Sequence, residues 1–365
     1  MRILQISSAS SFGGGERYVA DLSNALVARG HDLFAVVRPN SPLVPYLCID
    51  RNNIKTIPLR NALDPQSART LAKFVKDKQI DVVHAHMARD YSLAAYAVRG
   101  RQAKFVVTRH VLFPLSRLHR RTLSRATKII AVSGAVAKQL RGQHLVPDDR
   151  IALVHNGIDA ERYSSAGAGF DRKLFLTSKN IPADGFLISS IGELRKLKRH
   201  DDFIRAAAIV SKRIPDVHFV IAGVDTSPKG ETKHELIQLA GKLNLTDTVS
   251  FLGWLDDANK LLCATDVFVS ASETESFGLS IVEAMAMGTP VVATRTEGAQ
   301  EVLEDDKTGL LVPIGDVEQL AAAIVRLLSD KEQRKSLGSQ AAVTVRESFS
   351  LTRMVDAVEK IYLEA

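Results

Sequence analysis

The stretch that decides the fold reads Glu275-Ser-Phe-Gly-Leu-Ser-Ile-Val-Glu283 and continues as Ala284-Met-Ala-Met-Gly-Thr-Pro-Val-Val-Ala293. The apolar residues before it, 266–270, predict a short buried strand of a parallel sheet. From about Gly278, apolar side chains recur at helical spacing, and Gly288-Thr-Pro290 ends that helix before the next strand begins. The predicted order is therefore a strand, a polar loop, a helix and a second strand.

This arrangement predicts a site for a sugar joined to a phosphate. The free N–H groups at a helix N-terminus and the positive end of the helix dipole favour phosphate. Glu275 lies in the loop and Glu283 in the early helix, and carboxylates suit hydroxyl groups on either side of a phosphate. The alternative is an ordinary helix–strand unit with two solvated acids, because glutamate pairs at this spacing are common.

The same stretch resembles the motif of retaining glycosyltransferases of the GT-B fold, particularly glycosyltransferase family 4. Two glutamates with seven residues between them, followed by Ala-Met-Ala-Met-Gly-Thr-Pro-Val-Val, carry the resemblance. It covers nearly the whole chain and is most specific over residues 272–293. It implies an α/β, GT-B architecture of two Rossmann-like, doubly wound parallel-sheet domains facing across a cleft. The C-terminal helix would then cross back to the N-terminal domain.

Length and composition agree with two soluble domains. The chain has 365 residues, of which 45% are hydrophobic and 24% charged, and short apolar strands alternate with amphipathic helices as in a parallel sheet. We expect an acceptor-binding domain over residues 1–163 and a nucleotide-sugar-binding domain over residues 164–346. Residues 347–365 would form the returning helix.

The location follows from what the chain lacks. It has no apolar run of membrane-spanning length and no signal peptide. Its two cysteines, Cys48 and Cys263, match no metal spacing, and we expect both to be buried, reduced thiols. These features predict a cytoplasmic protein, with peripheral binding to the inner membrane face as a further expectation.

The net charge of +7 is unevenly distributed. Residues 1–170 hold 25 Lys and Arg against 12 Asp and Glu, a net of 25 − 12 = +13, which leaves −6 for the remainder. The basic segment 109–128 contains Leu115, Leu118 and Leu123 among its cations, and its residues 111–125 are expected to form a helix. Such a helix suits an anionic membrane surface or a phosphorylated acceptor, or it packs with a solvated basic face. Nucleic acid is not expected, because the segment has few aromatic residues for stacking.

A glycine-rich turn follows the first strand. Glycines there let the backbone approach a ligand closely and point amide N–H groups at it, although a simple tight turn explains them equally well. The run Gly13-Gly-Gly-Glu-Arg17 resembles the family's Gly-Gly-Ala-Glu-Arg element, with Gly15 in place of alanine. The resemblance places Gly14 and Gly15 against the acceptor and the donor diphosphate.

Three histidines lie at predicted strand ends, where open α/β sheets bind ligands. His84 and His86 point the same way and resemble the family's His-x-His; a polar lining of the cleft explains them better than metal binding. His110 ends the next strand in the family's Thr-x-His pattern. The resemblance implies that His110 contacts the transferred sugar near its 6-hydroxyl, or the acceptor. A hydrogen-bonded structural histidine is the alternative.

Basic residues follow the first strand of the second domain, in the run Glu193-Leu-Arg-Lys-Leu-Lys-Arg199. In the family an arginine and a lysine at this place hold the leaving diphosphate. Lys198 matches the lysine. Many members have the arginine where this chain has Glu193, so Arg195, three residues before the lysine, is our candidate. A solvated side chain is the alternative for either cation.

The resemblance also assigns the motif residues. Glu275 would hold hydroxyls of the transferred sugar, and Glu283 the ribose hydroxyls. The nucleotide sugar would further contact the loop and helix start formed by Ser276, Phe277, Gly278 and Leu279. No Asp-x-Asp pair occurs in the chain, which predicts that neither a metal nor another cofactor is needed.

The function expected is retaining transfer of a hexosyl group from a UDP- or GDP-sugar to an acceptor hydroxyl, with no enzymatic nucleophile. The acceptor would be a glycan or a lipid-linked molecule in cell-surface glycan, lipopolysaccharide or glycolipid assembly. Alternatives are a GT-B nucleotide-sugar epimerase, a basic nucleic-acid-binding protein and a non-catalytic GT-B scaffold.

Overall fold

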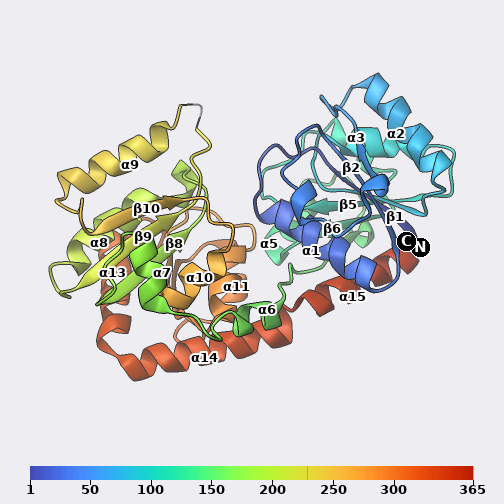
Figure 1. Cartoon of the computed structure of the whole chain (residues 1–365). Helices are drawn as coiled ribbons and strands as arrows, with labels where there is room; N and C mark the ends of the chain where they lie inside the picture. The colour runs from blue at the N-terminus through green and yellow to red at the C-terminus, as the bar shows by residue number, and fades with distance from the viewer. Residues whose placement is uncertain (228, 365) are drawn as a thin grey trace. The chain divides into compact units, whose positions relative to one another are not determined.

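The computed structural model describes residues 1–227 and 229–364 and shows an α/β protein with two compact units (Figure 1). The first unit is Met1–Ile158 together with the C-terminal helix α15 (Leu351–Glu364), and the second is Asp159–Ser350. The sequence placed the first domain boundary after residue 163 and the second after residue 346. Each unit has its own parallel sheet, and α15 belongs to the first unit, as the resemblance implied.

Within the described residues of the first unit, seven strands form one sheet in the order β3-β2-β1-β4-β5-β6-β7. Every neighbouring pair is parallel. The strand order reverses between β1 and β4, and ligands of doubly wound sheets bind beyond the carboxyl ends of the strands at such a point. The strands are β1 (Arg2–Ser7), β2 (Asp32–Val37), β3 (Ile54–Thr56), β4 (Val82–Ala85), β5 (Lys104–Arg109), β6 (Lys128–Ala131) and β7 (Ile151–Leu153).

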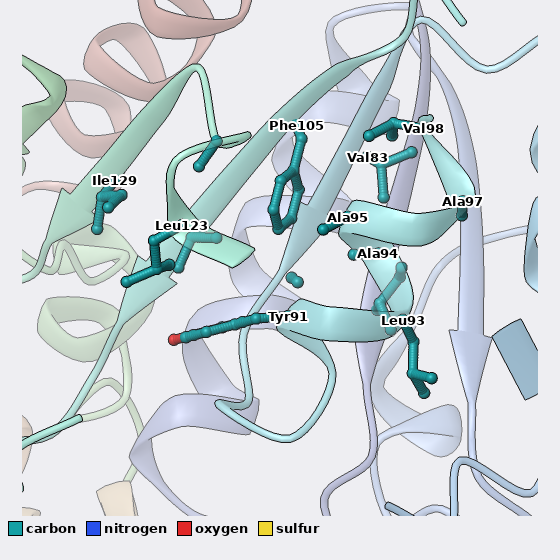
Figure 2. Packing of buried hydrophobic residues seen from close by; sticks show 14 of the residues in the cluster. Val83, Tyr91, Leu93, Ala94, Ala95, Ala97, Val98, Phe105, Leu123 and Ile129 are labelled. Carbon is teal, nitrogen blue, oxygen red and sulfur yellow. The ribbon is translucent and has the colours of Figure 1, made fainter. Parts of the chain in front are cut away.

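Helices cover both faces of this sheet because side chains alternate along each strand. One face packs Val83, Phe105 and their neighbours against α3, as Figure 2 shows. The other face packs Ile3, Val106 and their neighbours against α1 and α15. The helices are α1 (Gly14–Ala28), α2 (Pro65–Asp77), α3 (Tyr91–Ala97), α4 (His119–Leu123) and α5 (Gly134–Gly142), with 3-10 turns η1 (Val44–Tyr46), η2 (Arg51–Asn53) and η3 (Asp148–Arg150).

The C-terminal helix α15 is bound to the first unit by apolar and charged contacts. One stripe of the helix is buried, made of Met354, Val355, Val358, Ile361 and Tyr362. Arg29 at the end of α1 pairs with Asp356 at 2.6 Å and with Glu359 at 2.7 Å. The spacing of the buried residues is that of a helix with one face in a core, so this unit is completed by the end of the chain.

The second unit contains a parallel sheet of six described strands in the order β10-β9-β8-β11-β12-β13. Its order reverses between β8 and β11, so the loops that follow these two strands flank the expected ligand position. The strands are β8 (Phe186–Ile191), β9 (Val217–Ala222), β10 (Val249–Gly253), β11 (Val267–Ser270), β12 (Val291–Thr294) and β13 (Leu310–Val312).

The predicted strand–loop–helix–strand order of the motif is confirmed. Strand β11 leads through a loop to α11 (Leu279–Ala286), and β12 follows. Gly278 precedes the helix at a φ of 93°, a left-handed conformation that favours glycine. The other helices are α6 (Ala160–Ser165), α7 (Arg172–Ser178), α8 (His200–Val210), α9 (Glu231–Lys242), α10 (Ala258–Ala264), α12 (Glu297–Val302), α13 (Val317–Ser329) and α14 (Lys331–Ser348), with the 3-10 turn η4 (Lys196–Lys198).

Two local expectations were wrong. Cys48 is exposed and Cys263 is half-buried. Cys48 lies in a loop, where its backbone N–H donates to Asn24 Oδ1. The basic segment forms only the short helix α4 rather than a long one. Residues 111–118 before it are not helical, because Pro114 lacks a backbone N–H and a side chain binds the neighbouring backbone: Gln143 both donates to and accepts from the backbone of Leu115.

Candidate active site: an ion pair in the second unit and a histidine cluster in the first

The loops after β8 and β11 meet at the point where the strand order of the second unit reverses. The backbone N–H of Glu273, in the loop after β11, donates to the carbonyl of Leu197 in η4 at 2.8 Å. This bond ties the two loops together. Polar side chains on either loop are thus held at the sheet edge where doubly wound folds bind ligands.

Lys198 and Glu275 form an ion pair across these loops. Lys198 Nζ lies 2.5 Å from Glu275 Oε1, and the side chains are 27% and 11% exposed. The hydroxyl of Ser272 donates to the same carboxylate oxygen at 2.8 Å. The lysine stem runs beside Gly192, where a Cβ would lie 3.4 Å from Lys198 Cε. The result is a half-buried cation and anion in fixed positions.

The N-terminus of α11 adjoins this pair in sequence and carries no side-chain cap. Its first N–H groups are those that a helix leaves without an internal partner. Phe277 is buried and its ring contacts Phe349 at a centroid distance of 5.5 Å. The backbone carbonyl of Glu275 accepts a hydrogen bond from Gly298 N at 3.1 Å. The stretch from Glu275 to Leu279 is therefore fixed, while its helix end remains able to bind an anion.

Glu283 lies further along α11. Its Oε1 accepts a hydrogen bond of 2.8 Å from the hydroxyl of Tyr163, in α6. Tyr163 lies in the segment that we expected to end the first domain, but it belongs to the second unit. Within that unit it orients the Glu283 carboxylate.

Arg195 is not brought to the ion pair. Its side chain is 52% exposed and lies 3.3 Å from Glu193 Oε2, the residue that stands where many family members have arginine. The neighbouring Arg199 binds Asp202 at 2.6 Å and approaches Glu273. Arg195 is linked to Lys198 through the backbone, where Lys198 N donates to the Arg195 carbonyl at 2.9 Å.

In the first unit, Gly14 and Gly15 begin α1 and Gly15 lies against His110. A Cβ on Gly15 would stand 3.7 Å from His110 Cγ. The Tyr18 ring, one turn further along α1, contacts the His110 ring edge-on at 4.8 Å. His110 is half-buried. Burial, with Arg109 beside it, lowers the pKa of His110 to about 3, so the ring is neutral at physiological pH.

The His84 and His86 side chains share one face, as predicted, but His84 does not line a cleft. It is fully buried, with Nδ1 on Tyr362 at 2.6 Å and Nε2 on Thr108 at 2.7 Å. His86 is 4% exposed and lies between Gln5 and His110. Burial lowers the pKa of His84 to about 3 and that of His86 well below its usual range. The expectation failed because α15 covers this face.

Sequence reasoning missed several residues that hold these sites. The partners of the predicted groups are Ser272, Tyr163, Gln5, Thr108 and Tyr362. Strand alternation carried a signal for two of them. Gln5 in β1 and Thr108 in β5 lie on the face of His84, because alternate residues of parallel neighbours point the same way.

In the part of the chain that the structure describes, three or more His, Cys, Asp or Glu side chains are nowhere grouped so as to hold a metal ion. Among the same residues, every helix is too short or too polar to cross a membrane.

Comparison with known proteins decides the family. A sequence profile described as Glycosyl transferases group 1 matches residues 171–344, and one described as Glycosyltransferase Family 4 matches residues 12–162. The lipopolysaccharide core biosynthesis glycosyltransferase LpsE of Rhizobium meliloti is 30% identical over 350 residues, covering 94% of both chains. The chain belongs to the group 1, family 4 glycosyltransferases. This chain is also 28% identical to the N-acetyl-alpha-D-glucosaminyl L-malate synthase of Bacillus anthracis, over 98% of its own length and 96% of the synthase.

Solved structures agree on the fold. A glycosyltransferase from Rickettsia africae superposes with a TM-score of 0.88 at 24% identity, over 100% of this chain and 98% of that one. Anabaena Alr3699/HepE, solved in complex with UDP and glucose, superposes with a TM-score of 0.85 at 23% identity over the whole of both chains. The fold of this glycosyltransferase is GT-B, as the motif predicted.

Proposed function

We propose that this glycosyltransferase moves a hexosyl group from a UDP- or GDP-sugar to an acceptor hydroxyl, with retention at the anomeric carbon and without a metal ion. Its acceptor is a glycan or a lipid-linked molecule, in the assembly of a cell-surface glycan, lipopolysaccharide or glycolipid. The relative from Rhizobium meliloti is named for lipopolysaccharide core biosynthesis, and Alr3699/HepE was solved with UDP and with UDP-glucose. Both names support this class of donor and acceptor.

The observation that carries the proposal is the Lys198–Glu275 pair beside the uncapped start of α11. When a glycosyl–phosphate bond breaks, negative charge grows on the leaving diphosphate while the sugar approaches an oxocarbenium ion. Fixed cations and backbone N–H groups stabilise the leaving group best when they are positioned before the reaction. Lys198 and the amides near Gly278 and Leu279 fill that role, and Glu275 holds sugar hydroxyls.

The remaining candidates have supporting roles in this proposal. Glu283, held by Tyr163, accepts hydrogen bonds from the ribose hydroxyls. Arg195 binds the diphosphate from an exposed position, after exchanging its contact with Glu193. His110, with Gly14 and Gly15 beside it, contacts the transferred sugar or the acceptor. No side chain is assigned as nucleophile; the leaving phosphate takes the acceptor proton on the same face.

The first experiment identifies the donor and tests the pair. A thermal-shift panel of UDP- and GDP-sugars finds the donor, because a ligand that binds the folded state raises the melting temperature. Lys198→Ala and Glu275→Ala are then each expected to lower turnover by about 10²–10³-fold, the usual cost of removing one group that stabilises developing charge. Lys196→Ala is the matched control, since Lys196 is an exposed lysine of the same 3-10 turn. Wild-type transfer by either pair variant contradicts the proposal.

Two further measurements test the reaction itself. Product NMR reports the anomeric configuration, and an inverted product refutes retention. Turnover should be unchanged by EDTA. Loss of activity in EDTA that only a divalent cation restores would refute metal independence.

The basic segment 109–128 supports binding to an anionic membrane surface. It contains no Asp or Glu, and its Phe113 and Leu118 are 55% and 87% exposed. Arg117, Arg120 and Arg121 are exposed, and in the described chain none forms an ion pair. Exposed apolar side chains among unpaired cations favour the headgroup region of an anionic bilayer.

Charge reversal tests this surface. Replacing Arg117, Arg120 and Arg121 by Glu should abolish cosedimentation with vesicles of phosphatidylglycerol and phosphatidylcholine. The control reverses three exposed cations of the second unit, Arg205, Lys212 and Arg213, which changes the net charge equally. Equal binding by both variants would show that net charge alone, and not this segment, determines binding.

A further inference from the structure

A continuous chain of hydrogen bonds joins the C-terminal helix to His110 inside the first unit. Tyr362 Oη, in α15, lies 2.6 Å from His84 Nδ1 and 3.4 Å from Gln5 Nε2. The other end of the same amide, Gln5 Oε1, lies 2.7 Å from His86 Nε2. His86 Nδ1 in turn lies 3.2 Å from His110 Nε2. Four of these five side chains are buried, and His110 is half-buried.

The orientation of the Gln5 amide in the structure fixes the direction of each bond. Gln5 Oε1 can only accept, so His86 Nε2 carries the proton and donates. A neutral imidazole has one N–H, so His86 Nδ1 accepts, and His110 Nε2 must be the donor. The other branch agrees: the Gln5 amide donates to Tyr362, whose hydroxyl donates to His84 Nδ1, and His84 Nε2 donates to Thr108.

His110 is therefore left with an unprotonated Nδ1. Among the residues that the structure describes, no group bonds to His110 Nδ1. This nitrogen is also absent from the fully buried polar atoms that lack a partner, so it is not sealed inside the core. A half-buried ring with an open lone pair accepts a hydrogen bond from a hydroxyl group. It cannot donate one to a carbonyl or phosphate oxygen.

We propose that Tyr362 is a positioning residue that sets the tautomer of His110, so that His110 presents Nδ1 as an acceptor to a hydroxyl of the sugar or acceptor. The inference rests on the function proposed above for His110. Tyr362 acts through the Gln5 amide: because its one hydroxyl proton goes to His84 Nδ1, the tyrosine can only accept from Gln5, which places the amide N–H group on Tyr362 and Oε1 on His86. Without the Tyr362 hydroxyl, no group of α15 favours the Gln5 amide nitrogen over the amide oxygen at this position.

The reversed chain is the state that Tyr362 selects against. With the Gln5 amide turned over, His86 Nε2 would accept, His86 Nδ1 would donate, and His110 would carry its proton on Nδ1. Every bond between Gln5 and His110 reverses together, so the chain has two alternative directions and no intermediate one. Each direction gives a distinct set of ring ¹⁵N signals.

The experiment uses the full chain with ¹⁵N-labelled histidine. Two-bond ¹H–¹⁵N spectra report the tautomer, and His110→Asn assigns the His110 signals by their loss. Wild-type protein is expected to show His110 protonated on Nε2 alone. Tyr362→Phe keeps the ring volume, and it should produce both tautomers and lower kcat about 3- to 10-fold, with KM for the donor changed less than about twofold. Gln5→Leu should give the same mixture.

Lys104→Met is the matched control. Lys104 Nζ binds the carbonyl oxygens of Tyr362 and Leu363 at 2.8 and 2.9 Å. The variant therefore weakens the attachment of the same helix end without removing the hydroxyl. It should leave the His110 signals and kcat as in wild-type protein.

Two results overturn the inference: a wild-type His110 protonated on Nδ1, or a Tyr362→Phe variant with the wild-type tautomer and kcat. If Tyr362→Phe does not fold, the wild-type spectrum and Gln5→Leu still decide. A wild-type protein that transfers no sugar would refute the proposed function instead, and the spectra would still report the tautomer.

Discussion

Gly298 in α12 packs against the loop that carries Glu275, although it lies outside the motif. Its N–H donates to the carbonyl of Glu275 at 3.1 Å. A Cβ built on Gly298 would lie 2.6 Å from that carbonyl oxygen and 2.7 Å from the backbone N of Phe277. Both atoms belong to the main chain, which cannot move aside as a flexible side chain can. Gly298→Ala therefore tests how strictly the position of Glu275 is set.

The size of the effect follows from the overlap. Ordinary contact begins at 3.4 Å, so the loop must move by about 3.4 − 2.6 = 0.8 Å. Overpacking of this kind costs about 1–3 kcal/mol of folding free energy. The higher helix propensity of alanine than of glycine offsets about 1 kcal/mol of this loss in folding free energy. A displacement near 1 Å at a catalytic group lowers turnover by up to about 10²-fold, so activity should fall more visibly than stability.

Initial rates of nucleotide release and urea unfolding of both proteins measure the two effects. Gly241→Ala is the matched control, because Gly241 lies in helix α9 of the same unit and its Cβ would meet no atom within 4 Å. That variant should keep full turnover and gain up to about 1 kcal/mol. Gly298→Ala with wild-type turnover would refute the reasoning that packing behind the loop positions Glu275.

Three further predictions concern oriented and buried groups. Tyr163→Phe removes the hydroxyl that donates to Glu283 and should raise KM for the nucleotide sugar about 2- to 10-fold with little change in kcat, in initial-rate measurements; an unchanged KM contradicts it. Burial lowers the pKa of His84 and of His110 to about 3. The unfolded chain therefore binds more protons below pH 6.5, and each histidine should lower the free energy of unfolding by about 1.4 kcal/mol per pH unit as the pH falls toward 3. Urea unfolding at pH 7.5 and 5.5 checks this, and equal stability at both would count against it. Burial raises the pKa of Asp90 to about 6. Asp90→Asn keeps an oxygen acceptor and should raise the free energy of unfolding by up to about 3 kcal/mol above pH 6. Near pH 4, where the wild-type carboxyl is protonated, urea unfolding should show little difference between the two proteins.

The parts of the site that could be predicted are those that depend on local sequence. Residues 266–293 form a strand, a loop, a helix and a strand in the predicted order, because each boundary has its own signal. Gly278 adopts the left-handed conformation at the helix start, and Gly288 does so at its end. The meeting of Lys198 with Glu275 was expected from the resemblance, and the strand order explains it, since β8 and β11 are neighbours.

Predictions that depended on what covers a side chain were the ones that failed. The leucines of the basic segment suggested a helix, yet Leu115 and Leu123 are buried while Leu118 is 87% exposed. The direction of that segment is set by Gln143, which directly follows α5, and by Gln139 within α5, whose amide donates to the carbonyl of Leu112. Hydrophobic spacing reports that a residue will be buried, and it does not report which distant side chain will compete for the backbone.

The two units also differ in how far their functional groups lie apart in sequence. In the second unit, Glu275 and its partner Ser272 are three residues apart, so a motif contains both. In the first unit, strand alternation places Gln5, His84 and His110 on one face, but their hydrogen-bond directions depend on Tyr362, 278 residues from His84. A buried network has to be completed by whichever helix covers it, because each unpaired polar atom would be destabilising. The protonation of His110 is therefore determined by the last helix of the chain, and a motif at the strand end cannot specify it.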